Sequence, residues 1–332
     1  AVAIGGDVVW AGAAGWADPA SETPVTPQTV FRIGSTSKAL TGTALARLVD
    51  RGLIDLDRPI SEYLQKVPNA AWSNITARQL ASHMAGLPHY GDNSDLPGLY
   101  RTIALQSHYA RVSDALTVFD GSKLLYEPGT DFEYSSLGTV LLGAVIGDAA
   151  GMTYRELMQQ EVLEPAGMSA TIVAPKRAVP NTPFATFYLR RDGAFREWRP
   201  VDLSHRLPGG GYASTPSDLA RLGALVLDDD YLSSRTRAVF WQPQKTADGT
   251  VNEQDYALGW RWREYEIAGV GLARNANHGG VSRGSQCWLQ VFPEYDMTVA
   301  ITTNTNTEEF AEFGAIWRDI FAAFASAGAQ GQ

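Results

Sequence analysis

Patterns typical of β-strands occur at both ends of the chain, and patterns typical of helices fill the middle. Apolar and polar residues alternate in AVAIGGDVVWAG at the start and in YALGWRWREYEI, SQCWLQVF and MTVAITTN near the end. In the first segment, Gly5-Gly6-Asp7 predicts a hairpin turn. We therefore predict an α/β (α+β) fold: one antiparallel sheet built from both chain termini, flanked by helices, plus a mostly helical insertion.

The middle of the chain consists mainly of short helical patterns separated by proline and glycine. A helix is predicted from Ser35 to Asp50, with Gly52 as its C-terminal stop. Further helices are predicted over 78–84, 111–118, 137–149, 217–227 and 308–325. We treat residues 1–332 as a single unit, with a sheet subdomain at approximately 1–50 and 256–332 and a mostly helical subdomain at approximately 51–255.

Charge and composition exclude several classes of partner. The formal net charge is −9 and no block of Lys or Arg stands out, so nucleic acid and anionic membranes are poor partners. No run of eighteen apolar residues occurs, so we predict no transmembrane segment. The chain starts in a strand-like pattern without Met, and we expect residues before Ala1. The compartment stays open; an exported or periplasmic location is plausible, and a cytoplasmic one is an alternative.

The segment FRIGSTSKALTG, residues 31–42, contains a candidate nucleophile and base. Ser35 and Lys38 are three residues apart and would share one face of a helix. A serine hydroxyl is a weak nucleophile until a base takes its proton, and lysine can be that base only when neutral. The helix N-terminus also offers backbone N–H groups to a developing oxyanion. The alternative is that Ser35 only caps the helix and Lys38 is solvated.

Two other segments favour the catalytic interpretation. In FEYSSLGTVLLGAVIGDAAG, Tyr134 stands just before an apolar helix, where its phenol could carry protons to and from a reacting group. In NANHGGVSRGSQCWLQVF, His278 and two glycines precede a strand. A backbone N–H there could complete an oxyanion hole with that of Ser35.

Together these segments resemble the penicillin-recognising serine hydrolases. Ser35-Thr36-Ser37-Lys38, Tyr134-Ser135-Ser136 and His278-Gly279-Gly280 match, in order and spacing, the motifs S-x-x-K, Y-x-N and K-T-G or H-x-G. That superfamily includes class C β-lactamases, D-alanyl-D-alanine carboxypeptidases, family VIII carboxylesterases and the mitochondrial serine β-lactamase-like proteins. The segments LASHMAGLPHY, YEPGTDFEYSS, GGGYASTPSDLARLG and YALGW also look like family segments, so the resemblance covers nearly the whole chain.

The resemblance implies a role for each motif residue. Ser35 would be the acylated nucleophile, and Lys38 and Tyr134 would share general acid and base duty. His278 would line the pocket in place of lysine, and the backbone N–H groups of Ser35 and Val281 would form the oxyanion hole. The substrate would be a small ester, amide or peptide, hydrolysed without a metal or other cofactor. The family fold is an antiparallel sheet with helices on both faces beside an all-helical domain, and because the mitochondrial relatives include filament formers, a homo-oligomer is an open expectation.

The chain departs from the family pattern at two positions. Ser136 stands where many members have Asn, and a serine reaches less far toward a substrate amide. His278 stands where true β-lactamases carry lysine, so a permanent positive charge is missing. Arg283 is a candidate to replace that charge, with a solvated loop arginine as the alternative; Gly279 and Gly280 are expected to let substrate approach the backbone. Both departures argue against penicillin as the principal substrate.

The sequence also offers alternatives to this hypothesis. The segment GVSRG matches a nucleophile elbow at Ser282, but no histidine follows His278, so the chain order of an α/β-hydrolase triad cannot be built. The five histidines lack the spacing of a zinc site. Within the resemblance, a D-alanyl-D-alanine carboxypeptidase or a weak β-lactamase is the alternative activity. A non-catalytic scaffold or filament-forming relative is the alternative of another class.

Overall fold

The computed structural model describes residues 1–90, 107–191, 193–307 and 310–329. Its main sheet has six antiparallel strands in the order β10-β11-β12-β13-β1-β2. The strands are β1 (Val2–Ile4), β2 (Asp7–Trp10), β10 (Arg261–Ile267), β11 (Gly271–Ser282), β12 (Ser285–Phe292) and β13 (Met297–Thr303). Because β1 pairs with β13, residues from both chain ends complete one sheet, as predicted.

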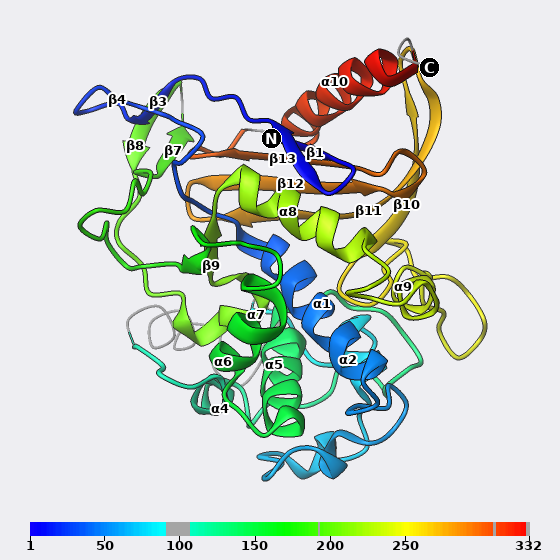
Figure 1. Ribbon diagram of the computed structural model, residues 1–332. Coiled ribbons are helices and arrows are strands. Elements are labelled where there is room, and N and C mark those ends of the chain that lie inside the picture. The colour runs from blue at the N-terminus through cyan, green and yellow to red at the C-terminus, as the bar shows by residue number, and fades with distance from the viewer. Residues whose placement is uncertain (91–106, 192, 308–309, 330–332) are drawn as a thin grey trace.

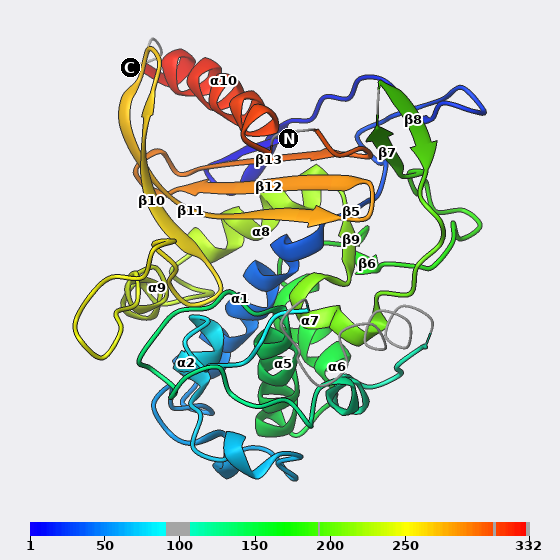
Figure 2. The same ribbon diagram turned by 180° about the vertical axis from the view of Figure 1, so that it is seen from behind.

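Helices cover both faces of this sheet. The helices are α1 (Ser37–Asp50), α2 (Ala77–Ala81), α4 (Val112–Ala115), α5 (Ser136–Ala150), α6 (Tyr154–Met158), α7 (Leu207–Gly210), α8 (Pro216–Leu227), α9 (Ser234–Phe240) and α10 (Phe310–Ala329). Helix α10 packs on one face, against β12 and β13, and α8 packs on the other (Figure 1). Helix α1 runs from the α8 side of the sheet into the group formed by α2, α5, α6 and α7 (Figure 2). These layers are those of the β-lactamase/transpeptidase-like fold.

Helices α1 and α5 form the centre of the helical part because nearly all of their side chains are buried. In α5, residues 136–147 are buried, which explains why its sequence is apolar on every face. The Ser135 hydroxyl accepts a hydrogen bond from the Gly138 N–H at 3.0 Å and caps the helix, and Gly151 ends it in the left-handed conformation. A separate apolar cluster joins the sheet to α10, where Phe292 stacks on Phe321 at 3.9 Å.

Three smaller sheets accompany the main sheet. One has the order β5-β9-β6, and the others pair β3 with β4 and β7 with β8. Their strands are β3 (Trp16–Asp18), β4 (Thr23–Pro24), β5 (Phe31–Arg32), β6 (Ile172–Val173), β7 (Tyr188–Arg191), β8 (Ala194–Glu197) and β9 (Tyr212–Ser214). Strand β5 leads directly into the segment that contains Ser35.

The structure differs from the sequence-based expectation in two places. His278 and its two glycines do not precede a strand: they lie inside the twelve-residue strand β11, because the chain turns only at Arg283 and Gly284. Strands β6 to β9 also lie within the segment expected to be mostly helical. These strands are short, so alternation over them is too brief to distinguish them from loops. Glu308, the expected start of the last helix, lies outside the described residues.

Candidate active site

Ser35 lies in a 3₁₀ turn, η1 (Gly34–Thr36), immediately before α1. Gly34 has a φ of +52°, and a Cβ at that position would come within 2.6 Å of the Val281 carbonyl oxygen. Gly280 is even more constrained, because its Cβ would lie 1.9 Å from the Ile33 carbonyl oxygen. The two glycines therefore let strand β11 lie directly against the turn that presents Ser35.

The Lys38 side chain is buried and its amine is surrounded by oxygen atoms. Nζ lies 2.7 Å from the Gly209 carbonyl oxygen, 2.9 Å from Ser136 Oγ and 3.3 Å from Ser35 Oγ. Only 1% of the residue is exposed. Burial, followed by the positive charges of Arg206 and Arg261, lowers the pKa of Lys38 well below its usual value. Burial thus favours a neutral amine beside the Ser35 hydroxyl.

Tyr134 lies over this lysine. Its ring centroid is 4.8 Å from Lys38 Nζ. Burial raises the pKa of Tyr134 to about 12, opposed by the charge of Arg261 and by a hydrogen bond with the Ser35 side chain. The sequence-predicted residues Ser35, Lys38, Tyr134 and Ser136 therefore meet at one point, although they come from two different helix starts.

Two histidines hold the segment that carries Tyr134. The Ser135 N–H donates to His83 Nδ1 at 3.3 Å, and the Ser136 N–H donates to His89 Nδ1 at 3.2 Å. The His83 ring also packs against the Tyr134 ring, with centroids 4.3 Å apart. A ring nitrogen that accepts a hydrogen bond carries no proton, so these contacts fix the tautomers. The three sequence motifs do not include these two histidines, whose only signal was their presence in the family-like segment LASHMAGLPHY.

His278 faces the same side of the sheet, but it is fully buried. Its Nδ1 lies 2.7 Å from the Gly279 carbonyl oxygen, so Nδ1 donates, and Nε2 accepts from the Tyr256 hydroxyl at 2.9 Å. Burial, together with the charges of Arg261 and Lys38, lowers the pKa of His278 well below its usual value. Both nitrogens of this neutral ring therefore have partners inside the protein.

The remaining predicted residues of the third motif lie around β11 in different directions. A Cβ at Gly279 would lie 2.8 Å from both Trp288 and Phe310, so this position faces the α10 side, away from Ser35. Half of Val281 is exposed, and its backbone adjoins Gly34. Arg283 lies past the end of β11, with its guanidinium 5.2 Å from the centre of the Trp198 ring.

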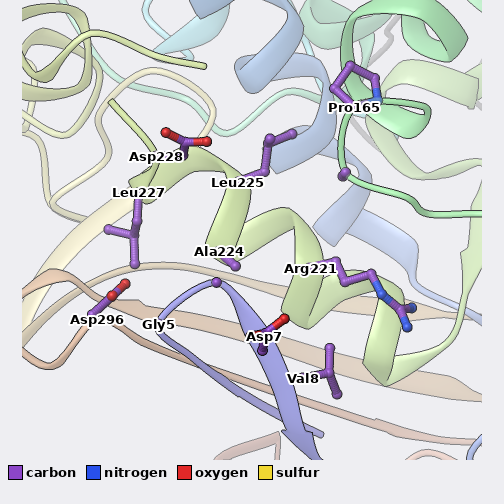
Figure 3. Close-up of a pocket in the computed structure, with 12 residues that line it drawn as sticks. Gly5, Asp7, Val8, Pro165, Arg221, Ala224, Leu225, Leu227, Asp228 and Asp296 are labelled. Atoms are coloured by element: carbon purple, nitrogen blue, oxygen red, sulfur yellow. The ribbon is translucent and has the colours of Figure 1, made fainter. Parts of the chain in front are cut away.

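A separate hollow lies between the β1–β2 hairpin and α8 (Figure 3). It has a volume of about 660 Å³ and is bounded by the β1–β2 hairpin, Pro165 and the end of α8 (Figure 3). Asp7, Asp228 and Asp296 line it together with Arg221, which is already paired with Asp218 at 2.8 Å. None of the predicted site residues lies in this hollow.

Neither a metal-binding cluster nor a single membrane-spanning helix occurs within the described ranges. There, no group of three or more His, Cys, Asp or Glu side chains could hold a metal ion. No single helix of the described chain has the length and apolar character needed to cross a membrane. The bent pair Ser136–Ala150 and Tyr154–Leu163 meets that criterion by length and composition alone.

The sequence matches a known protein family over nearly its whole length. The family model described as Beta-lactamase matches residues 1–323. The chain belongs to the Beta-lactamase family. Its relatives include the mitochondrial serine beta-lactamase-like protein LACTB of Homo sapiens, which is 25% identical over 88% of this chain and 68% of its own length. Penicillin-binding protein 4* of Bacillus subtilis is 25% identical over 78% of this chain and 58% of its own length.

Solved structures support the same fold. A D-amino acid amidase from Ochrobactrum anthropi SV3 has a TM-score of 0.77 at 21% identity, covering 98% of this chain and 93% of its own. An octameric penicillin-binding protein homologue from Pyrococcus abyssi has a TM-score of 0.74 at 22% identity, covering 92% of this chain and 68% of its own. This Beta-lactamase family chain is therefore serine-hydrolase-like in both sequence and fold.

Proposed function

We propose that this protein is a serine hydrolase that cleaves ester or amide bonds through an acyl-enzyme on Ser35. The observation that carries the proposal is the buried Lys38 amine, 3.3 Å from Ser35 Oγ. A solvated, charged lysine would fit the alternative of a simple helix cap, but this side chain is 1% exposed.

The hydrogen bonds around Lys38 are consistent with a base. A neutral amine has two N–H donors and one lone pair. The Gly209 carbonyl can only accept, so it takes one N–H, and Ser136 Oγ takes the other. The lone pair is then directed to the Ser35 proton. As Ser35 Oγ attacks the substrate carbonyl, its proton passes to this nitrogen, and the carbonyl oxygen becomes an oxyanion.

Tyr134 and two backbone amides complete the proposed mechanism. The Tyr134 ring lies over the Lys38 amine, with its centroid 4.8 Å from Nζ, so we assign its phenol to deliver a proton to the leaving group and later take one from water. We assign the oxyanion hole to the backbone N–H groups of Ser35 and Val281, because the Val281 backbone adjoins Gly34. Water then attacks the acyl-enzyme and releases the acid.

The environment of the site favours a small ester or a small amide over penicillin. Ser136 Oγ is paired with the Lys38 amine, and both ring nitrogens of His278 are paired with Tyr256 and Gly279. These two side chains also lack the amide and the ammonium group with which Asn and Lys of the family motifs would bind a β-lactam. We therefore propose that His278 does not bind substrate directly and instead positions the Tyr256 side chain through their hydrogen bond. A carboxylesterase or peptidase is the leading assignment, and penicillin hydrolysis is expected to be slow.

The test is hydrolysis of p-nitrophenyl butyrate by the wild type and by Ser35→Ala, side by side. Turnover by the wild type with none by a folded Ser35→Ala variant supports the proposal, because the alanine variant cannot be acylated. Equal turnover by both proteins contradicts it. A panel of a D-amino acid p-nitroanilide, a small peptide and a penicillin then separates amidase, peptidase and β-lactamase activity.

The scaffold alternative and the assembly state are tested by separate measurements. A fluorophosphonate probe that labels the wild type but not Ser35→Ala would exclude a vestigial site. The octamer is a property of the Pyrococcus abyssi homologue; homo-oligomerisation of this chain stays a prediction, to be measured by light scattering coupled to gel filtration.

A further inference from the structure

The charge of the site does not come from the third motif. In true β-lactamases a lysine supplies a permanent cation there, but His278 is neutral, buried and fully hydrogen-bonded. Arg283 does not fill that role either, since its guanidinium lies on Trp198 beyond the end of β11. A permanent charge near Lys38 and Tyr134 therefore comes from other residues.

Arg261 lies next to these residues on the neighbouring strand. It is the first residue of β10 and pairs with Asn277, which precedes His278 on β11. Its guanidinium carbon lies 5.0 Å from the centre of the Tyr256 ring and 5.6 Å from that of the Tyr134 ring. A guanidinium within about 6 Å of an aromatic centroid is attracted to the ring face.

Within the described ranges, no carboxylate neutralises the charge of Arg261. Its Nη2 donates to the neutral amide oxygen of Gln254 at 2.6 Å. Among the described residues no acidic side chain forms an ion pair with it. Arg263, two residues along the same strand, differs in this respect because its Nε lies 3.2 Å from Asp255 Oδ2. Arg261 thus contributes a full positive charge beside the two tyrosines.

We propose that Arg261 is a positioning residue that replaces the lysine of the third motif as a permanent cation beside both Lys38 and Tyr134. This inference rests on the proposed function. The Arg261 guanidinium holds the face of the Tyr134 ring, and its charge favours the neutral Lys38 amine that accepts the Ser35 proton. The charge acts through space and through the ring contact, without touching the reacting atoms.

The other groups around the pair are consistent with this role. Burial, then Arg206, then Arg261 lower the pKa of Lys38, and Arg261 is the nearby cation that also opposes the raised pKa of Tyr134. The neighbouring titratable rings are those of His83, His89, His278, Tyr90 and Tyr256. The pKa values of buried His83 and His278 are well below the usual value, so these two rings add no positive charge at neutral pH.

The experiment is the pH profile of kcat/KM for p-nitrophenyl butyrate in Arg261→Gln, Arg261→Lys and Arg263→Gln. Removal of the Arg261 charge should raise the pKa of the base. The acidic limb of Arg261→Gln should therefore move to higher pH by about one unit, the size expected for a unit charge several Å away at intermediate dielectric. This is about a tenfold loss on that limb, with activity recovering above it. Arg261→Lys retains a cation and should keep the wild-type limb.

Arg263→Gln is the matched control, because it removes an arginine from the same strand whose charge is already paired. Its limb should stay in place. The proposal is overturned if Arg261→Gln loses activity by the same factor at every pH, or if Arg261→Lys or Arg263→Gln shifts the limb as far. Should Arg261→Gln not fold, Arg261→Met keeps the apolar stem against the two rings and must give the same shift. Turnover that survives in Ser35→Ala would instead refute the proposed function.

Discussion

At the scale of single residues, the buried Lys38 amine is the most informative feature. Its spacing from Ser35 is visible in the sequence, but its burial is not, since it depends on Ser136 and Gly209 from distant segments. Tyr134 could be proposed from its motif. Arg261 could not, because nothing in its local sequence distinguishes a residue beside the site from one in an ordinary strand. His83 and His89 carried only the signal of their family-like segment, which does not say that they contact the segment of Tyr134.

Replacing Lys38 tests the proposed base. Lys38→Met keeps the length of the apolar stem but removes the lone pair that takes the Ser35 proton. We expect kcat/KM to fall by about 10²–10⁴, the usual contribution of a positioned acid or base. Steady-state kinetics with p-nitrophenyl butyrate measures this loss, and circular dichroism confirms the fold. A loss of less than tenfold would mean that Lys38 is only structural.

At the scale of elements, the contact between strand β11 and turn η1 decides where Ser35 points. The sequence predicted the helix from residue 35, and the structure begins α1 at Ser37, with Ser35 in the preceding 3₁₀ turn. The sequence pattern also predicted His278 before a strand, whereas it lies inside β11. Strand β11 carries two adjacent glycines, a composition depleted in strands, and its pairing with β10 and β12 outweighs that local preference.

Gly280→Ala tests this contact. A Cβ there would lie 1.9 Å from the Ile33 carbonyl oxygen, so β11 and η1 must separate. We expect a loss of about 1–3 kcal/mol in the free energy of unfolding. The kcat/KM of the protein that remains folded should also fall, because Ser35 moves relative to Lys38. Denaturant unfolding and kinetics measure the two effects.

The control for this substitution is Gly121→Ala. Gly121 is exposed, and a Cβ there would meet nothing within 4 Å. It should change the free energy of unfolding by no more than about 0.5 kcal/mol. A Gly280→Ala variant as stable and active as this control would show that the β11–η1 contact does not position Ser35.

At the scale of the whole molecule, buried neutral histidines make stability depend on pH. Burial lowers the pKa of His83 and His278 well below the usual value and that of His205 to about 3. In the unfolded chain these groups titrate near 6.5. Below that pH the unfolded state binds more protons than the folded state, so stability is present above about pH 6.5 and is lost as the pH falls toward the folded pKa values.

We therefore expect the free energy of unfolding to be lower at pH 5.5 than at pH 7.5. Each such histidine contributes at most about 1.4 kcal/mol per pH unit to the slope. Urea unfolding at several pH values measures it. His205→Gln should flatten the slope by about one histidine's share, since the unfolded variant gains one proton fewer. An unchanged slope in that variant would contradict the burial of a neutral imidazole at this position.

The division of the chain into a sheet subdomain and a mostly helical subdomain stays a prediction. What the sequence by itself determined was the set of motifs, the helix α1 with its stop at Gly52, the helix α5, and a sheet built from both chain ends. Spacing and periodicity are local properties, so they can be read along the chain. The tertiary structure decided which groups are buried, and burial decides which of them are charged. The neutral states favoured for Lys38 and His278, and the permanent cation supplied by Arg261, depend on atoms that only folding brings together.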